Sequence, residues 1–74
     1  MSSLAEQKIR KELGFKIKEL RKNLKLSQED FSESLKITSS YLGFIEQGIR
    51  SPSLSLLVKI AGKLNVEVWE LFKN

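Results

Sequence analysis

The apolar residues of this chain recur at spacings of three and four positions, the period of an amphipathic helix, and no segment sustains the alternation of a strand. The pattern repeats five times along the 74 residues. It predicts helices over residues 4–24, 27–35, 38–47, 54–64 and 67–72, joined by short connections. The fold class that follows is all-α, a compact domain of five helices.

Polar residues and glycines mark where several of these helices begin and end. Ser27, which acidic residues follow, and Thr38 are typical N-caps, and Gly48 is placed to end the third helix. Gly14 lies inside the first helix and is expected to weaken or break it. The positions expected to face the core are Ile9, Leu13, Ile17, Leu20 and Leu24, then Phe31 and Leu35, then Tyr41, Leu42 and Ile45, then Leu54, Leu57, Val58, Ala61 and Leu64, and finally Val68, Leu71 and Phe72.

Three aromatic residues fit this pattern less simply. Phe15 lies off the apolar stripe of the first helix and is expected to be partly exposed. Trp69 and Phe72 cannot both be buried easily by a helix of six residues. Two interpretations stay open: Phe72 belongs to the core and Trp69 is a partly covered lid, or the two residues form a patch through which two copies associate.

The composition excludes several classes of function. The chain contains no cysteine and no histidine, so disulfides, zinc fingers, thiol nucleophiles and the commonest general base are absent. The carboxylates follow no calcium-loop pattern, and no cofactor is expected. No apolar run approaches the roughly 18 residues of a membrane span, and residues 1–12 lack the apolar segment of a secretory signal. A cytoplasmic protein is therefore expected, and an enzyme is not, because no base lies beside a nucleophile.

The charge distribution is uneven. The net charge is +4, which favours a polyanionic partner. Residues 1–25 carry a net charge of +5 and residues 50–74 carry +2, whereas residues 26–49 carry −3. Charge alone would therefore place a polyanion against the two ends of the chain and not against its middle.

The second and third predicted helices are separated only by Lys36 and Ile37, which is the geometry of a helix-turn-helix. Many helical proteins contain such a corner, so the geometry alone is a weak indication of function. Here the surrounding residues strengthen it. From Leu13 onward the chain resembles the lambda-repressor-like helix-turn-helix family, also called the Cro/cI or Xre type. The matching residues are Leu13, Ile17, Leu20, Arg21, Leu26, Ser27, Gln28, Glu29, Leu35, Ile37, Thr38, Ile45, Glu46, Gly48, Pro52, Ser53, Leu57, Ile60, Ala61, Leu64, Val66, Leu71 and Phe72.

The resemblance implies a division into residues 1–12, an N-terminal extension expected to be helical, and residues 13–74, the helix-turn-helix domain. It implies that the third helix enters the major groove of double-stranded DNA. The residues it places at base edges are Ser39, Ser40 and Phe44. Those it places at the DNA backbone are Gln28, Thr38, Gln47 and Arg50.

The resemblance also implies a largely buried ion pair between Arg21 and Glu46. Arg21 directly follows the core-facing Leu20, and Glu46 directly follows Ile45, so each lies at the rim of an apolar stripe. A bidentate guanidinium–carboxylate pair at this place would fix the recognition helix.

Three departures from the family pattern affect the interpretation. Lys36 stands at the turn position that is usually glycine, so either it adopts a left-handed or bridge conformation or the turn differs from that of the family. Gly43 replaces the usual serine of the recognition helix and lowers its stability. Ser39 and Ser40 tolerate several bases, and Phe44 offers only apolar contact, best with a thymine methyl.

These observations favour a sequence-specific regulator of transcription that acts as a homodimer on a near-palindromic operator, with repression as the default. Trp69 and Phe72 are the preferred dimer surface, and residues 4–13 are the rival. The alternative is a protein-interaction module, antitoxin-like or anti-repressor, that kept the fold and lost DNA binding. Ser39, Ser40 and Phe44 offer only weak base-specific contacts, so this alternative stays open.

Overall fold

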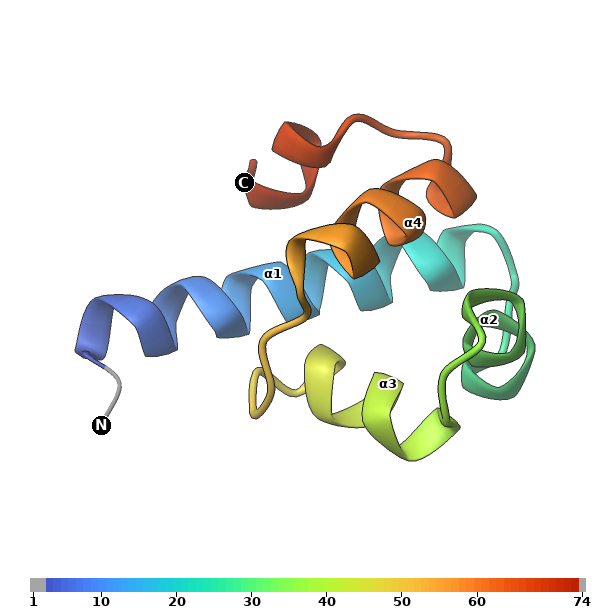
Figure 1. The fold of residues 1–74 in the computed structure, drawn as a ribbon. Coiled ribbons are helices and arrows are strands. Elements are labelled where there is room, and N and C mark those ends of the chain that lie inside the picture. Colours follow the sequence, from blue (N-terminus) through green and yellow to red (C-terminus); the bar gives the residue numbers. More distant parts are fainter. Residues whose placement is uncertain (1–2, 74) are drawn as a thin grey trace.

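A computed structural model describes residues 3–73 of the chain. Four α-helices and a 3-10 helix follow one another: α1 (Leu4–Asn23), α2 (Gln28–Leu35), α3 (Ser39–Glu46), α4 (Leu54–Leu64) and η1 (Val68–Phe72). Figure 1 shows the long helix α1, with α2 and α3 beside one another, α4 crossing next to α1, and η1 returning to α1. The described residues contain no strand, and the predicted all-α class is confirmed.

Hydroxyl side chains begin all four α-helices. The Thr38 Oγ1 accepts a hydrogen bond from the Tyr41 N–H at 3.0 Å, and the Ser27 Oγ accepts one from the Asp30 N–H at 2.9 Å. Ser3 and Ser53 act in the same way at α1 and α4. These caps satisfy backbone donors that have no partner within the helix, so they fix the starts of the helices that the sequence predicts.

The last predicted helix has a different geometry. Its five residues form a 3-10 helix, which Glu67 and Glu70 cap reciprocally. Residues three apart lie on the same side of such a helix. Leu71 is buried, so Trp69 and Phe72 share the outer side and are 61% and 46% exposed. The interpretation that places Phe72 in the core is therefore wrong.

The first helix continues through Gly14 without the expected break. A Cβ atom at Gly14 would overlap the carbonyl oxygen of Ile45 and lie 2.7 Å from that of Glu46. The missing side chain lets the backbones of α1 and α3 approach closely. The helix-propensity cost of this glycine is thus offset by packing that the sequence pattern does not display.

The core lies where α1, α2, α3 and α4 meet, and Leu71 of η1 closes it. Its buried apolar residues are Leu13, Ile17, Phe31, Leu35, Leu42, Ile45, Leu56, Leu57, Ile60, Ala61, Leu64 and Leu71. The expected inward positions Leu54 and Val58 are exposed, and Leu56 and Ile60 are buried instead. α4 is apolar around most of its circumference, so two rotations about its axis fit the apolar pattern. Packing against α1 and α2 selects one of them.

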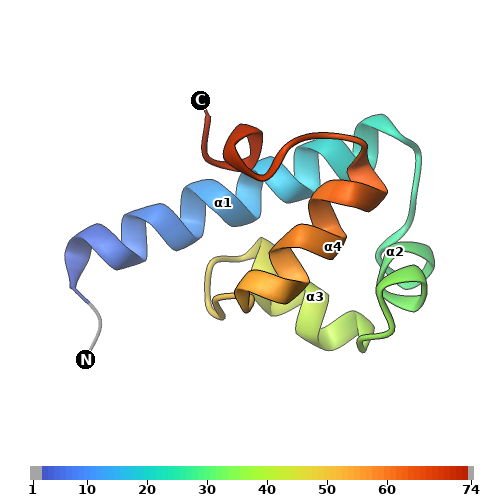
Figure 2. The same ribbon diagram turned by 45° about the horizontal axis from the view of Figure 1, so that its top comes forward.

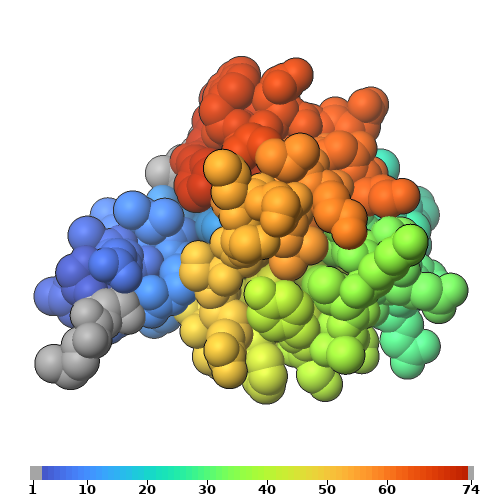
Figure 3. Space-filling model, in the orientation of Figure 1, coloured from blue at the N-terminus to red at the C-terminus, as the bar shows by residue number. Residues whose placement is uncertain are grey.

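The stripe of α1 is buried only in its central part. Ile9 and Leu24, both predicted to face the core, are exposed. Figure 3 shows the reason for Ile9: the N-terminal turns of α1 project beyond the rest of the molecule. Figure 2 shows the same overhang from a second direction, with η1 beside the middle of α1. Within residues 3–73 no helix is long and apolar enough to cross a membrane.

Candidate nucleic-acid interface

The turn between α2 and α3 is tight and left-handed at its first residue. Lys36 has φ 61° and ψ 41°, the left-handed one of the alternatives that the sequence leaves open. The Ile37 N–H donates to the Ser32 carbonyl at 3.0 Å, and the Ile37 side chain packs against the core. This turn sets the direction in which α3 leaves α2.

The recognition helix α3 has one buried side and one exposed side. Leu42 and Ile45 are fully buried against the core. Ser39, Ser40 and Phe44, the candidate base-reading residues, are all exposed, Phe44 to 42%. The exposed side of α3 can therefore meet a ligand without any rearrangement of the core.

A buried polar network holds the C-terminal end of α3. The Arg21 Nε and Nη2 atoms donate to the two oxygens of Glu46 at 2.7 and 3.1 Å, and both residues are buried. Arg21 Nη1 donates to the Leu26 carbonyl at 2.6 Å, and Gln28 Nε2 donates to Glu46 Oε1 at 2.9 Å. The network joins α1, the start of α2 and the end of α3.

Gln28 thus has a structural partner besides its predicted place at the DNA backbone. Its side chain and that of Gln47 both lie close to Gly43, where a Cβ atom would be 3.7 Å from the Gln28 amide nitrogen and 3.8 Å from that of Gln47. The Gln28 Nε2 atom carries two hydrogens, and one of them is directed at Glu46. Its role as a phosphate ligand stays a prediction.

The remaining candidate backbone ligands lie at the two ends of α3. Thr38 caps its start, and its hydroxyl oxygen is engaged there. Gln47 and Arg50 are exposed at its end. The N–H groups of Ile49 and Arg50 both donate to the Phe44 carbonyl, at 2.9 and 3.2 Å, so the loop folds back over the end of the helix.

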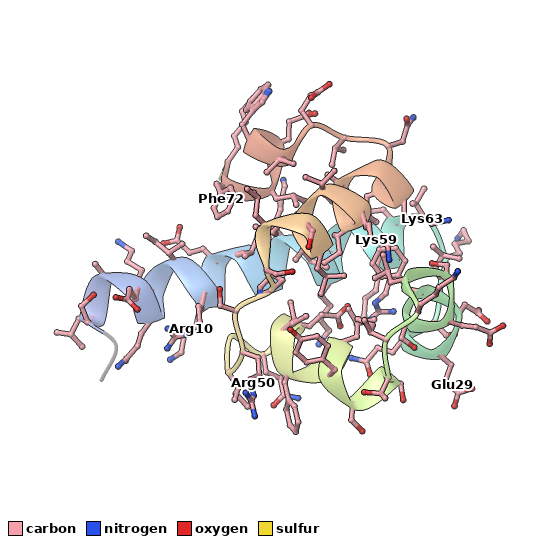
Figure 4. All side chains as sticks on the ribbon, viewed as in Figure 1. Arg10, Glu29, Arg50, Lys59, Lys63 and Phe72 are labelled. Atoms are coloured by element: carbon pink, nitrogen blue, oxygen red, sulfur yellow. The ribbon has the colours of Figure 1, made fainter. Side chains whose placement is uncertain are left out.

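One basic residue next to this loop escaped sequence reasoning. Arg10 of α1 donates through its Nε atom to the Gly48 carbonyl at 3.2 Å. Figure 4 shows Arg10 and Arg50 pointing to the side of the molecule on which α3 lies. The only signal for Arg10 in the sequence is its charge, because the residues before Leu13 lie outside the resemblance.

The acidic residues of the middle segment lie on α2. Glu29, Asp30 and Glu33 are all exposed. In Figure 4, Glu29 points outward from α2 at the far end of the α2–α3 pair from Arg50. The exposed negative charges of residues 26–49 therefore lie on α2. Two basic residues from outside this segment, Arg10 and Arg50, lie near the C-terminal end of α3.

Comparison with known proteins identifies the family. A two-helix corner with an exposed second helix, anchored from behind by buried polar groups, is the arrangement of a helix-turn-helix unit. The family model described as helix-turn-helix (HTH_3) matches residues 17–71. The chain belongs to this family of DNA-binding transcription regulators.

Three similar proteins illustrate the family. An immunity repressor of Bacillus phage phi105 is 41% identical over 56 residues, which cover 76% of this chain and only 39% of that repressor. The restriction-modification controller protein C.AhdI from Aeromonas hydrophila has a TM-score of 0.79 at 37% identity, covering 84% of this chain and 94% of that one. SinR, a master regulator for biofilm formation solved in complex with DNA, has a TM-score of 0.74 at 33% identity, covering 80% and 95%.

Proposed function

We propose that this protein is a sequence-specific regulator that binds double-stranded DNA as a homodimer on a near-palindromic operator and represses a promoter. It acts in the cytoplasm, without a cofactor and without catalysing a reaction. The observation that carries the proposal is the state of α3: its outer side is exposed while its inner side is fixed by Arg21, Glu46 and Gln28.

Base reading is assigned to Ser39, Ser40 and Phe44. They occupy the first two turns of α3, where the recognition helix of this type of motif contacts base edges. Serine hydroxyls exchange hydrogen bonds with several bases, and the Phe44 ring contacts a thymine methyl. A relative of the same fold, 33% identical to this chain, was solved in complex with DNA, and this supports DNA binding by the domain as a whole.

Affinity for the DNA backbone is assigned to Gln28, Thr38, Gln47 and Arg50. These residues surround both ends of α3, so phosphates on either side of the groove are within their reach. Few of them are charged, and we therefore expect weak non-specific binding and a moderate dependence on salt.

The homodimer is assigned to the outer side of η1. Trp69 and Phe72 are the exposed apolar residues there. Beside Phe72, a groove of about 420 Å³ between α1 and η1 is lined by Phe15 and Leu71 among others. The rival surface, residues 4–13, offers exposed Leu4 and Ile9, whereas Leu13 belongs to the core. The C-terminal surface carries the larger apolar side chains and is preferred.

Selection of binding sites from random duplex DNA with the purified protein tests the proposal. An enriched palindrome is the expected result, and its half-sites should lie about 10 base pairs apart, centre to centre. Enrichment should be lost when Ser39, Ser40 and Phe44 are all replaced by alanine. Replacement of Leu54 and Val58, which are exposed on α4, is the matched control and should leave it intact.

The competing function is a protein-interaction module on the same fold. The exposed acidic residues of α2 are the feature that favours it, because they repel phosphates and attract a basic partner. Failure to enrich any duplex, even at low salt, would contradict the regulator and favour this alternative.

A further inference from the structure

The N-terminal turns of α1 contact the loop that follows the recognition helix. Arg10 Nε donates to the Gly48 carbonyl at 3.2 Å, and the Arg10 side chain is only 20% exposed. Gly48 has φ 78°, and a Cβ atom there would lie 2.8 Å from the Lys11 Cα atom. Gly48 therefore rests directly on the backbone of α1. The family match begins only at residue 17, so neither Arg10 nor Lys11 belongs to the matched segment.

The loop from Gly48 to Ser53 is held at both of its ends. At its start, α1 fixes Gly48, and the N–H groups of Ile49 and Arg50 bond to the Phe44 carbonyl. At its end, Pro52 is buried and Ser53 caps α4. Arg50 lies between these fixed points and is exposed. The direction in which Arg50 leaves the loop thus depends on the orientation of the peptide groups after Gly48.

We infer that Arg10 is a positioning residue for DNA binding: it holds the Gly48 carbonyl and thereby orients the loop that carries Arg50 to the DNA backbone. This inference rests on the proposed function and adds the N-terminal extension to the DNA-binding unit. A loop ordered before binding loses less conformational entropy when it meets a phosphate. The positive charge of Arg10 also lies near the C-terminal end of α3, where the helix dipole favours a cation.

A direct phosphate contact by Arg10 is the competing role, and the side-chain contacts weigh against it. Its Nε atom is directed at Gly48, and its Nη1 atom lies 3.9 Å from the Glu6 carboxylate, which repels an approaching phosphate. Within residues 3–73, Arg50 forms no ion pair with an acidic residue. The geometry fits Arg10 as the support and Arg50 as the ligand.

Two substitutions separate the hydrogen bond of Arg10 from its charge. The amide nitrogen of glutamine is as many bonds from Cα as the Nε atom of arginine, so Arg10→Gln keeps a donor at that place and removes the charge. Arg10→Met keeps a stem of similar length and removes both donor and charge. If Arg10 supports the loop through its hydrogen bond, only Arg10→Met should loosen the loop and weaken DNA binding.

The first measurement is amide hydrogen exchange in the free protein, which needs no DNA. Arg10→Met should speed exchange of the Ile49 and Arg50 amides about fivefold, the effect of losing one hydrogen bond. The amide of Val66, which bonds to Ala61 far from this loop, is the internal control and should be unchanged. Arg10→Gln should match the wild type. Unchanged loop exchange in Arg10→Met would overturn the inference.

The second measurement is affinity for a duplex that the wild-type protein enriches from random DNA. Arg10→Met should weaken binding about fivefold and Arg10→Gln less than about twofold. In an Arg50→Ala background, Arg10→Met should add less than about twofold, because the supported ligand is already gone. The inference would be overturned if both Arg10 variants lost affinity equally and if these losses added fully to the loss in Arg50→Ala. Such a result would assign a phosphate contact to Arg10. A wild-type protein that enriches no duplex overturns the proposed function instead, and the exchange measurement tells the two failures apart.

Discussion

The Glu46 carboxylate accepts three hydrogen bonds, two from Arg21 and one from Gln28, at a place that is almost closed to water. Within the described residues no buried polar side-chain atom lacks a partner. Removal of one charge from such a network leaves the other desolvated without compensation. The main role of the Arg21–Glu46 pair is therefore to fix the position of α3, even where its net contribution to the free energy of unfolding is small.

The first prediction concerns this pair. Arg21→Met should lower the free energy of unfolding by about 3–5 kcal/mol, because it leaves the Glu46 carboxylate buried and unpaired. Arg21→Met combined with Glu46→Leu should recover part of this loss, since both charges are then gone. The control is Lys16→Ala, which breaks the exposed Lys16–Glu19 pair and should cost less than about 1 kcal/mol. Urea unfolding measures all three, and equal small losses would contradict the buried role of the pair.

The second prediction concerns Phe44. Phe44→Ala should relax discrimination at one base pair of each half-site by roughly 1 kcal/mol, because the apolar contact with a thymine methyl is lost. The ring is 42% exposed, so thermal stability should change little. Binding to a panel of single-base variants of the operator measures the effect. Val58→Ala, an exposed apolar change on α4, should leave the preference unaltered, whereas a large drop in Tm for Phe44→Ala would assign that ring to the core.

At the scale of elements, the crossing of α1 and α3 depends on a glycine. The carbonyl oxygens of Ile45 and Glu46 occupy the space that a side chain at Gly14 would need. Gly62 of α4 offers the opposite case, since nothing lies within 4 Å of the place where its Cβ atom would be. Two glycines inside helices thus have opposite expected responses to the same substitution.

The third prediction uses this contrast. Gly62→Ala should stabilise the protein by about 0.5–1 kcal/mol, the difference in helix propensity. Gly14→Ala should destabilise it by more than that amount, because the backbones of α1 and α3 must separate. Thermal unfolding of both variants measures the difference in sign. A stable Gly14→Ala variant would show that the contact between the two helices is loose.

The sequence predicted those features of the elements that depend on neighbours along the chain. Ser27 and Thr38 mark helix starts because an N-cap bonds to a backbone N–H three residues on, and Lys36 marks the turn by its place between two short helices. For α4 the buried positions Leu57, Ala61 and Leu64 were predicted correctly. Leu54 and Val58 were wrongly placed in the core, because they fit the apolar period as well as Leu56 and Ile60 do. Only contacts with other helices choose between the two.

The candidate site likewise contains residues that the sequence predicts and contacts that it does not. Ser39, Ser40 and Phe44 were proposed from resemblance, and their exposure follows from the opposite placement of Leu42 and Ile45. The contact of Arg10 with Gly48 joins residues 38 positions apart and leaves no local pattern. The bond from Gln28 to Glu46 is equally invisible in the sequence, because it depends on how α2 and α3 cross.

At the scale of the whole molecule, charge predicts how binding responds to salt. The logarithm of the affinity should fall linearly with the logarithm of the salt concentration, with a slope of about −0.9 per phosphate neutralised. Arg50→Ala should weaken binding to all sequences alike and make the slope shallower by about one such contact. Lys63→Ala, which removes an exposed charge on α4, is the control and should change neither. An altered sequence preference in Arg50→Ala would contradict its assignment to the backbone.

Assembly is the property on which specificity depends most, because one recognition helix covers about half a site and each correct base pair contributes only about 1–3 kcal/mol. Two copies on one duplex roughly double this energy, and a two-fold dimer needs a self-complementary patch. Trp69 and Phe72 lie on the same outer side of η1, and Leu71 rather than either of them holds η1 to the core. Trp69→Ala should therefore keep the fold and raise the dissociation constant of a micromolar dimer at least about tenfold, a loss of about 1.4 kcal/mol. Ile9→Ala tests the rival surface on α1 and should leave the dimer unchanged. Sedimentation equilibrium decides between them: a monomeric wild type, or a Trp69→Ala dimer as tight as the wild type, would contradict the assignment to η1.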